Sequence, residues 1–465
     1  MPSERTAALA VTLLGHASLI VETPDAVIYC DPVLHDPHQE GLFEIHPPRS
    51  INAAALPTAT HIFVSHQHFD HFDLRSLAAF PRATPVIVPN DDLVATGVRA
   101  LGFETVERIE DWSRIEIGGT RLCFTRSEYR VPEHGLIVES GGVRLWNQVD
   151  TVVSPETVTR VREEIGQIDL LIAPWQPLLD TVVQYNLDYR FPLRRYVDNL
   201  VRAARVGAQV TVPGACGFRF AAAWDWQNHL CFPVTRERCV RDLERLRTAP
   251  EQRVLTLDPG DRLVLGPAGP ELGASGAVTR TQPGATDLLE FDPTLGRFLG
   301  TAVFGGDAEA DAGTLLSVFE ERLEEAFAAD PGLAGHFAEW EVVQQIALVG
   351  REGRMIVHCD LRGAAPVFGR GGHPLANMHT LVSVDGLSDL AAGRWSWDRL
   401  TASGAYRHHR SLFRLTPGGV ETPGADLADP LWIAFPYAES LAAKMDGEIL
   451  RYRAAEPTVG LRERE

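Results

Sequence analysis

Residues 63–73 read FVSHQHFDHFD and place three histidines and two aspartates within eight positions, directly behind an apolar run. A metal site, a proton relay and an accident of composition are the three readings of such a stretch. Neutral imidazole and carboxylate are ligands that zinc, iron and manganese accept in proteins. Four ligand-type side chains in six positions, His66, His68, Asp70 and His71, favour the metal site over coincidence.

The spacing of these side chains indicates two neighbouring metal ions. The run HIFVS that precedes them is typical of a strand, so the side chains are expected on the turn that leaves its end. His66 and His68 are two residues apart and can point the same way, whereas Asp70 and His71 turn to another side. Asp73, just beyond, either orients a ligand imidazole or begins a helix.

Short apolar runs broken by turns fill residues 10 to about 125 and predict the strands that position this loop. VTLLG, AVIYCD and PVIVP are examples, with helix-like pieces such as DLRSLAAF and DDLVATGVRALG between them and SPETVTRVREEIG later. Strand pairs with intervening helices predict an α/β chain with layered packing.

The chain length of 465 residues exceeds one ordinary core, so two domains are expected. Residues 266–286 are rich in Gly, Ala and Pro and have no period. They are predicted to link a domain over 1–265 to a smaller α+β domain over 287–465. In the second domain, 313–332 has a helical apolar stripe, and EVVQQIALVG with RMIVHCDLRG reads as a hairpin.

The composition argues against several classes of function. The formal net charge of −19 repels phosphate backbones and no local basic patch offsets it, so no nucleic-acid partner is expected. No apolar run approaches the roughly 20 residues that span a bilayer. The N-terminus lacks signal-peptide features, so a cytoplasmic protein without membrane insertion is expected. The six scattered cysteines predict no disulfide framework.

The segment HQHFDH matches the HxHxDH signature of the metallo-β-lactamase superfamily, and the chain resembles this family in order over roughly residues 10–235. Supporting elements are the turn Gly15-His16-Ala17-Ser18, Asp31 after an early strand, His134 before a strand, and Asp150 at the end of the next one. The resemblance implies a metallo-β-lactamase αββα sandwich, followed here by the smaller α+β domain.

The same resemblance implies a ligand set for two divalent metal ions. His66, His68 and His134 would hold one metal. Asp70 and His71 would hold the other, and Asp150 would bridge them, with Asp70 and Asp150 as the candidate catalytic residues.

Two departures from the family pattern concern these ligands. Val149 precedes Asp150 where the family has glycine. The last metal histidine of the family is missing, because the equivalent place reads Val-Pro-Gly-Ala-Cys and ends at Cys216. His229 in WDWQNHLCFP is the nearest substitute, with a surface or core histidine as its alternative; a Cys216 thiolate would be unusual among imidazole and carboxylate ligands.

The stretches VPGACGFRF and WNQVD resemble the CMP-N-acetylneuraminate hydroxylase-like branch, whose characterised members are oxygenases with a Rieske domain. No cysteine here stands in a Cys-x-His or Cys-x-x-His pair, so an oxygenase would take its electrons from an external donor or from the substrate. We therefore expect a dinuclear oxygenase, with iron favoured over zinc or manganese, acting on a small polar metabolite. The alternative is a dinuclear hydrolase of a lactone, amide or phosphoester.

Substrate contacts are expected from three places. His16 lies in the turn that borders the active site of ascorbate-phosphate lactonase-like relatives. The aromatic and amide-rich segment 174–192 and the WDWQNHL stretch supply the remaining candidates, Trp175, Gln176, Tyr185, Asn186, Tyr189 and Asn228. The region 287–465 faintly resembles a sterol-carrier-like domain, which could bind an apolar ligand, form a lid or make a homodimer.

Overall fold

The structure is a computed structural model that describes residues 9–180, 182, 191–266, 269–281, 308–350, 353–416, 419–424 and 427–460. Within these residues no helix combines the length and the apolar character that crossing a bilayer requires.

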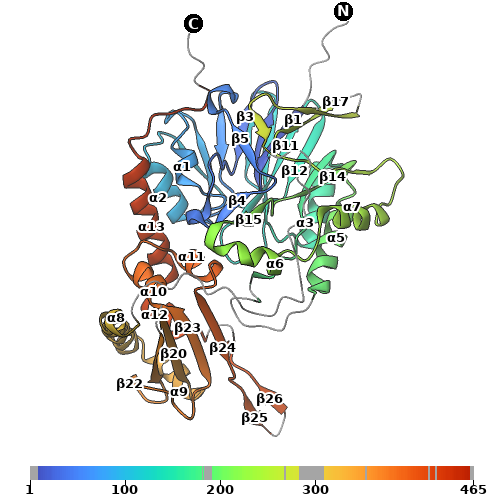
Figure 1. The fold of residues 1–465 in the computed structure, drawn as a ribbon. Coiled ribbons are helices and arrows are strands. Elements are labelled where there is room, and N and C mark those ends of the chain that lie inside the picture. The colour runs from blue at the N-terminus through green and yellow to red at the C-terminus, as the bar shows by residue number, and fades with distance from the viewer. Residues whose placement is uncertain are drawn as a thin grey trace, which may run out of the picture.

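An eight-stranded sheet forms the first half of the N-terminal part (Figure 1). Its order is β18-β17-β1-β2-β3-β6-β7-β8, antiparallel up to β3 and parallel beyond it. The run of β7 is buried at every position, as a continuous apolar stretch predicts. The strands are β1 (Leu9–Gly15), β2 (Ser18–Glu22), β3 (Val27–Cys30), β6 (His61–Phe63), β7 (Val86–Pro89), β8 (Val106–Ile109), β17 (Asp261–Gly266) and β18 (Gly269–Ala274).

A seven-stranded sheet packs against the first one. Its order is β16-β14-β13-β12-β11-β10-β9, antiparallel from β9 to β12 and parallel from β12 to β16. Phe63 of one sheet and Phe124 of the other meet in the core between them. The strands are β9 (Arg114–Ile117), β10 (Thr120–Arg126), β11 (His134–Ser140), β12 (Val143–Asn147), β13 (Leu170–Pro174), β14 (Val210–Gly214) and β16 (Arg253–Val254).

Helices cover the outer face of each sheet, which confirms the predicted αββα sandwich (Figure 1). The first face carries α1 (Leu74–Leu77), α2 (Asp92–Ala100) and α13 (Tyr437–Tyr452). The second carries α3 (Pro155–Arg160), α5 (Leu193–Val206) and α7 (Arg236–Arg245). Ser154 accepts a hydrogen bond from the Thr157 amide and begins α3, as expected.

Two short strand pairs lie outside the two large sheets. β4 (Phe43–Ile45) pairs with β15 (Phe218–Phe220), and β5 (Arg49–Ile51) pairs with β19 (Val278–Arg280). Further one-turn pieces are η1 (Gln39–Gly41), η2 (Ala53–Ala55), η3 (Val161–Ile165), η4 (Ala222–Gln227) and α6 (Asn228–Cys231).

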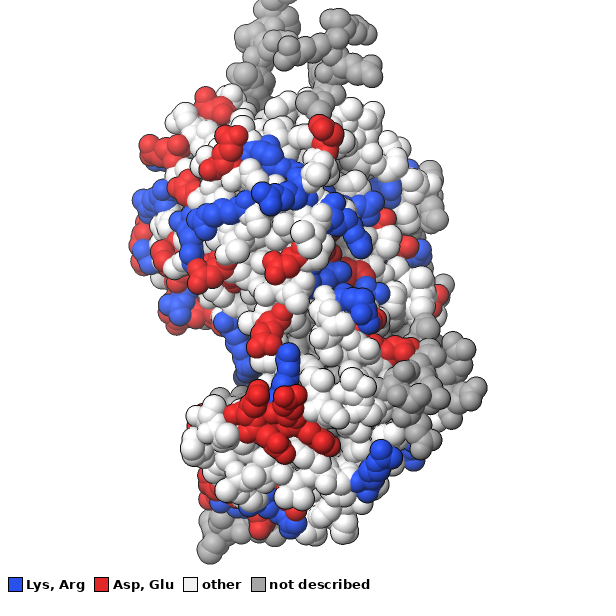
Figure 2. Space-filling model, turned by 90° about the vertical axis from the view of Figure 1, so that its left-hand side faces the viewer, with Lys and Arg blue, Asp and Glu red and all other residues white. Residues whose placement is uncertain are grey.

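The C-terminal part is a five-stranded sheet of order β22-β21-β20-β23-β24 with helices packed on it. The expected hairpin is confirmed as β20 (Val343–Gly350) and β21 (Gly353–Asp360), and the expected helix as α8 (Ala308–Ala329). α8 exposes Glu321, Glu324 and Glu325, and Figure 2 shows acidic side chains gathered on the lower part of the molecule. The remaining elements are β22 (Val367–Arg370), β23 (Met378–Ser383), β24 (Tyr406–Arg410), β25 (Arg414–Thr416), β26 (Gly419–Glu421), α9 (Pro331–Glu339), α10 (Val384–Ala391), α11 (Trp397–Ala402) and α12 (Pro430–Ala434).

Two features differ from the expected division at a 266–286 linker. β18 and β19 lie within that range, because Gly- and Pro-rich composition does not prevent a strand from pairing at a sheet edge. The last helix, α13, returns to the N-terminal sandwich, where Leu441 and Met445 join the apolar cluster beneath α1 and α2 (Figure 1).

Candidate metal centre

The histidine loop, residues 64–72, leaves the end of β6 and is anchored by two buried phenylalanines. Phe69 and Phe72 belong to the apolar cluster under the first sheet. The backbone amides of His71 and Phe72 both donate to the carbonyl of His68, at 2.9 and 2.7 Å. This tight turn directs the polar side chains of the loop away from the core.

Asp73 begins α1, and its carboxylate accepts a hydrogen bond from the amide of Ser76 at 2.6 Å. The helix-start reading of Asp73 is therefore confirmed. Burial raises the pKa of Asp73 to about 6.

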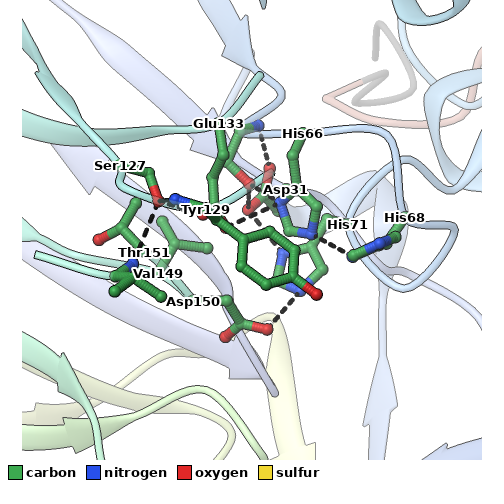
Figure 3. A network of polar contacts seen from close by, with 12 residues as sticks. Asp31, His66, His68, His71, Ser127, Tyr129, Glu133, Val149, Asp150 and Thr151 are labelled. Carbon is green, nitrogen blue, oxygen red and sulfur yellow. Dashed lines mark hydrogen bonds and ion pairs between the residues drawn. The ribbon is translucent and has the colours of Figure 1, made fainter. Parts of the chain in front are cut away.

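His71 is fixed by the buried carboxylate of Asp31, which follows β3 (Figure 3). Asp31 Oδ2 is 2.9 Å from His71 Nδ1 and accepts the Ser65 hydroxyl at 2.7 Å, while Oδ1 accepts the Ser65 amide at 2.7 Å. Nδ1 of His71 therefore donates to Asp31, which leaves Nε2 as the nitrogen that faces Asp70 and Asp150. Burial alone would lower the pKa of His71, but the carboxylates of Asp70, Asp150 and Asp31 outweigh it and raise the pKa.

His66 and His68 turn ring nitrogens toward each other (Figure 3). Nε2 of His66 and Nδ1 of His68 are 2.8 Å apart. The opposite nitrogen of His66, Nδ1, is 2.9 Å from the Ser65 hydroxyl and 3.5 Å from Oε1 of Glu133. Burial lowers the pKa of His66 and raises that of Glu133 to about 7, so the imidazole is held neutral, as a metal ligand must be.

A second group consists of His16, Asp70 and His71, whose candidate ligand atoms all lie within 4.8 Å of one another. Nε2 of His16 is 3.2 Å from Oδ2 of Asp70. Nε2 of His71 lies 3.6 Å from Asp70 Oδ2 and 3.4 Å from Asp150 Oδ2. The turn after β1 thus places His16 beside Asp70 and His71, in a chain that lacks the histidine expected last in the family pattern.

These residues fit a metal pair on two observations. Nε2 of His71 is buried between two carboxylates and makes no hydrogen bond, so a cation that replaces its proton would meet one imidazole nitrogen and two carboxylates. His66 and His68 point two nitrogens at one place, as two ligands of one ion do. Imidazole with carboxylate suits iron, zinc or manganese.

Val149 keeps the left-handed backbone that the family's glycine would adopt before Asp150. Its φ is 49°, a costly conformation for a β-branched residue. Its amide donates to Asn147 Oδ1 at 3.1 Å, and its buried side chain packs with Ala17 and Ala215. This departure from the family pattern therefore leaves the turn that presents Asp150 intact.

His134 lies on β11 with its ring turned toward Asp111, at 3.5 Å between Nδ1 and Oδ1. Neighbouring residues of a strand face opposite sides, so Glu133 faces His66 while His134 faces away. Sequence reasoning missed Glu133, and its only signal was its place directly before the expected histidine.

Among the described residues, neither substitute considered for the missing histidine belongs to the cluster formed by His16, Asp70 and His71. His229 is on α6 and is not part of the cluster of ligand-type residues that the described chain brings together. Cys216 lines a pocket with His16 and Val149, but burial and then Asp150 raise the pKa of its thiol well above the ordinary value.

Of the predicted substrate residues that the structure describes, His16 contacts Asp70, whereas Trp175, Gln176 and Asn228 direct their polar atoms to backbone groups. Trp175 Nε1 donates to Ala215 O at 3.3 Å, and Gln176 Nε2 to Val234 O at 2.7 Å. Asn228 bonds both backbone groups of Phe220. Three further candidates, Tyr185, Asn186 and Tyr189, lie outside the described residues.

A different aromatic side chain, Tyr129, lies over the group instead (Figure 3). Its ring is 6.5 Å from that of His68, and it is 51% exposed. It is therefore open to a ligand at the mouth of the centre.

Comparisons with known proteins agree with this arrangement. Residues 27–198 match the family model described as Beta-lactamase superfamily domain. A Mycobacterium tuberculosis protein provisionally named a Rieske 2Fe-2S iron-sulfur protein is 26% identical over 227 residues, covering 44% of this chain and 43% of that protein. An uncharacterised Mycobacterium bovis protein is 30% identical over 113 residues, 23% of this chain and 30% of the relative. The matches thus span less than half the length of these curated relatives.

Two solved structures illustrate the fold likeness. CmlA, a diiron β-hydroxylase from Streptomyces venezuelae, has a TM-score of 0.39 at 18% identity, covering 57% of this chain and 55% of CmlA. An isothiocyanate hydrolase from Delia radicum gut bacteria has a TM-score of 0.38 at 15% identity, covering 54% and 97%. The part of the chain that matches the Beta-lactamase superfamily domain model, residues 27–198, includes the histidine loop and Asp150.

Proposed function

We propose that this protein is a dinuclear metalloenzyme, and that it is an oxygenase with two iron ions acting on a small polar metabolite. The observation that carries the proposal is the buried, unbonded Nε2 of His71 between Asp70 and Asp150, with Nδ1 fixed by Asp31. A nitrogen held in that way is placed to bind a cation and contributes no hydrogen bond to the fold.

His66 and His68 would hold one metal, and Asp70, His71 and His16 the other, with Asp150 between them. A pair of irons in such a nitrogen and oxygen ligand set supplies the reduction of dioxygen. Asp31 keeps the His71 proton on Nδ1, and Ser65 with Glu133 holds the ring of His66. Tyr129 and the exposed edge of Asp150 border the space for substrate.

The preference for oxygen chemistry rests on the sequence. The VPGACGFRF and WNQVD stretches resemble the hydroxylase-like branch, and some of the matched mycobacterial proteins are provisionally named as Rieske iron-sulfur proteins. No cysteine of these 465 residues stands in a Rieske ligand pair, so the electrons would come from a donor outside these residues or from the substrate.

Hydrolysis of a lactone, amide or phosphoester is the second candidate. The Asp150 side chain is 38% exposed beside His71, so water reaches the space between the two carboxylates. A zinc pair in the same ligands lowers the pKa of a bound water to about 7.

Metal analysis of full-length protein purified anaerobically from iron-supplemented cells distinguishes the oxygenase from the hydrolase. We expect about two irons per chain and an absorption band after exposure to air. Two zincs and a featureless spectrum would instead support hydrolysis, and one metal per chain would refute the dinuclear centre. In the control variant His68→Ala, metal content and activity should fall together; full metal occupancy would contradict the assignment.

A further inference from the structure

A cavity of about 40 Å³ lies between the two large sheets of the sandwich, and it is the pocket that Cys216 lines. Leu19 of β2 borders it from the first sheet, and Ile172 of β13 and Val212 of β14 border it from the second. These three side chains belong to the apolar core between the sheets and are at most 4% exposed. The cavity is therefore a feature of the interior of the sandwich.

Two residues of the cavity wall also belong to the metal centre. His16 lines the cavity, and its Nε2 is 3.2 Å from Oδ2 of Asp70. Val149, which directly precedes Asp150, lines it as well. A molecule in the cavity would thus lie behind the imidazole of His16 and the turn that presents Asp150.

The volume of the cavity restricts its occupant to a very small molecule. One water-sized molecule needs about 10–15 Å³ of such space, so about three would fill the cavity. A metabolite with more than a few non-hydrogen atoms does not fit, whereas a diatomic molecule does.

The charged and ionisable groups in the wall do not offer a free charge to the cavity. Burial, and then the charge of Asp150, raise the pKa of Cys216, so the thiol stays neutral. The guanidinium of Arg236 donates to the carbonyl of Leu257 at 2.6 Å and to the carboxylate of Asp258 at 2.5 Å. An ion in the cavity would therefore lack a counter-charge.

The remaining polar groups are few. Asn147 lies two residues after the core residue Leu145 and so faces the space between the sheets. Its Nδ2 and Nδ1 of His16 are buried and make no hydrogen bond within the described chain. A buried water typically needs two to four polar partners, so these two groups suffice for a single water, while the aliphatic side chains offer water no partner.

We propose that this cavity holds dioxygen beside the metal pair. An uncharged, apolar, diatomic molecule matches both the volume and the aliphatic part of the wall. The inference rests on the proposed oxygenase function and deepens it, because it assigns a place to the gaseous substrate that is separate from the site of the metabolite.

Xenon is the first probe, since an aliphatic cavity binds this apolar atom without any metal. Crystals of the metal-free full chain under xenon pressure should show a xenon site in the cavity. Val212→Ile adds one methylene group to the wall, and we expect xenon affinity to fall about tenfold or more. Val210→Ile is the matched control, because it makes the same change two residues earlier on the same face of β14, in the same core but outside the cavity wall, and should keep the xenon site.

Nitric oxide is the second probe, because it is a diatomic gas that binds Fe(II) and requires no metabolite. The rate of its binding to anaerobic, Fe(II)-loaded protein is measured by stopped-flow absorbance. If the cavity supplies the metal pair, Val212→Ile should slow binding about tenfold at unchanged iron content, and Val210→Ile should bind at the wild-type rate.

The outcomes distinguish this inference from the proposed function. Ordered waters in place of xenon in the wild-type cavity overturn the inference, as does a wild-type rate of nitric oxide binding in a Val212→Ile protein that has lost its xenon site. Wild-type protein that binds no iron overturns the proposed function, while the xenon site is still measured in metal-free crystals. Circular dichroism identifies a variant that fails to fold, in which case xenon occupancy of the wild-type cavity decides.

Discussion

The substitution Asp31→Asn tests whether the tautomer of His71 is set by its buried partner. Asn tolerates the left-handed backbone at this position, where φ is 43°, and it keeps one oxygen for the Ser65 amide. Its NH₂ group then replaces Oδ2 and faces Nδ1 of His71, where two donors oppose each other. In the metal-free protein the ring can move its proton to Nε2 and accept the new donor, so the loss of stability should be modest, about 1 kcal/mol.

When a metal binds, His71 must keep Nε2 for the cation and its proton on Nδ1. The Nδ1 proton then faces the new NH₂ group of the substituted side chain, so two donors oppose each other. A lost buried hydrogen bond to a charged group costs about 1.5–3 kcal/mol, which corresponds to about 10- to 100-fold in affinity. The loss should fall on the metal bound by His71, Asp70 and His16, and not on the one bound by His66 and His68.

A titration of metal-stripped protein with Co(II), resolved into two binding steps, measures both affinities. Asp73→Asn is the matched control, because it makes the same chemical change at a nearby buried aspartate. The carboxylate of Asp73 caps α1 by accepting the Ser76 amide, and it does not contact an imidazole. Wild-type affinity at both steps in Asp31→Asn, or an equal loss at both, would refute the tautomer argument.

Two further predictions concern ligand identity and pH. His16→Ala should reduce metal content from about two ions per chain to about one, whereas His134→Ala should keep both, since His134 faces Asp111; elemental analysis of the pair decides, and loss of metal in His134→Ala would reverse the assignment. Burial raises the pKa of Glu40 to about 7. Between pH 4.5, the ordinary pKa, and pH 7 the folded protein keeps this proton while the unfolded chain has released it. The free energy of unfolding therefore falls as the pH rises through this range. Urea unfolding at pH 5 and pH 7.5 should therefore show Glu40→Gln gaining on the wild type at the higher pH, and a pH-independent difference would contradict the assigned burial.

Most of the sandwich and the histidine loop could be predicted because their signals are local. Continuous apolar runs such as that of β7 specify buried strands wherever they occur, and ligand-type residues in one turn need no distant partner to be recognised. The turn at Val149 also keeps the left-handed backbone expected for the glycine of the family pattern, because packing with Ala17 and Ala215 compensates for the strained φ.

The ligand set was harder to predict, because it depends on which face of a strand points inward. A shift of one residue exchanges Glu133 and His134 between the two faces of β11, and nothing within the segment fixes that choice. His16 presents a similar problem: its turn lies 54 positions from Asp70 in the sequence, and only the closed sandwich brings their side chains to 3.2 Å.

The contribution of the C-terminal part is the most distant of these effects. The apolar face of α13 predicts burial but not against which surface, and its Met445 contacts the same core as Phe72 of the histidine loop. The last helix therefore packs in the same apolar cluster as the loop that carries the candidate metal ligands. Unfolding of the C-terminal part should consequently weaken metal binding as well, which makes metal affinity a direct measure of how tightly the two parts are joined.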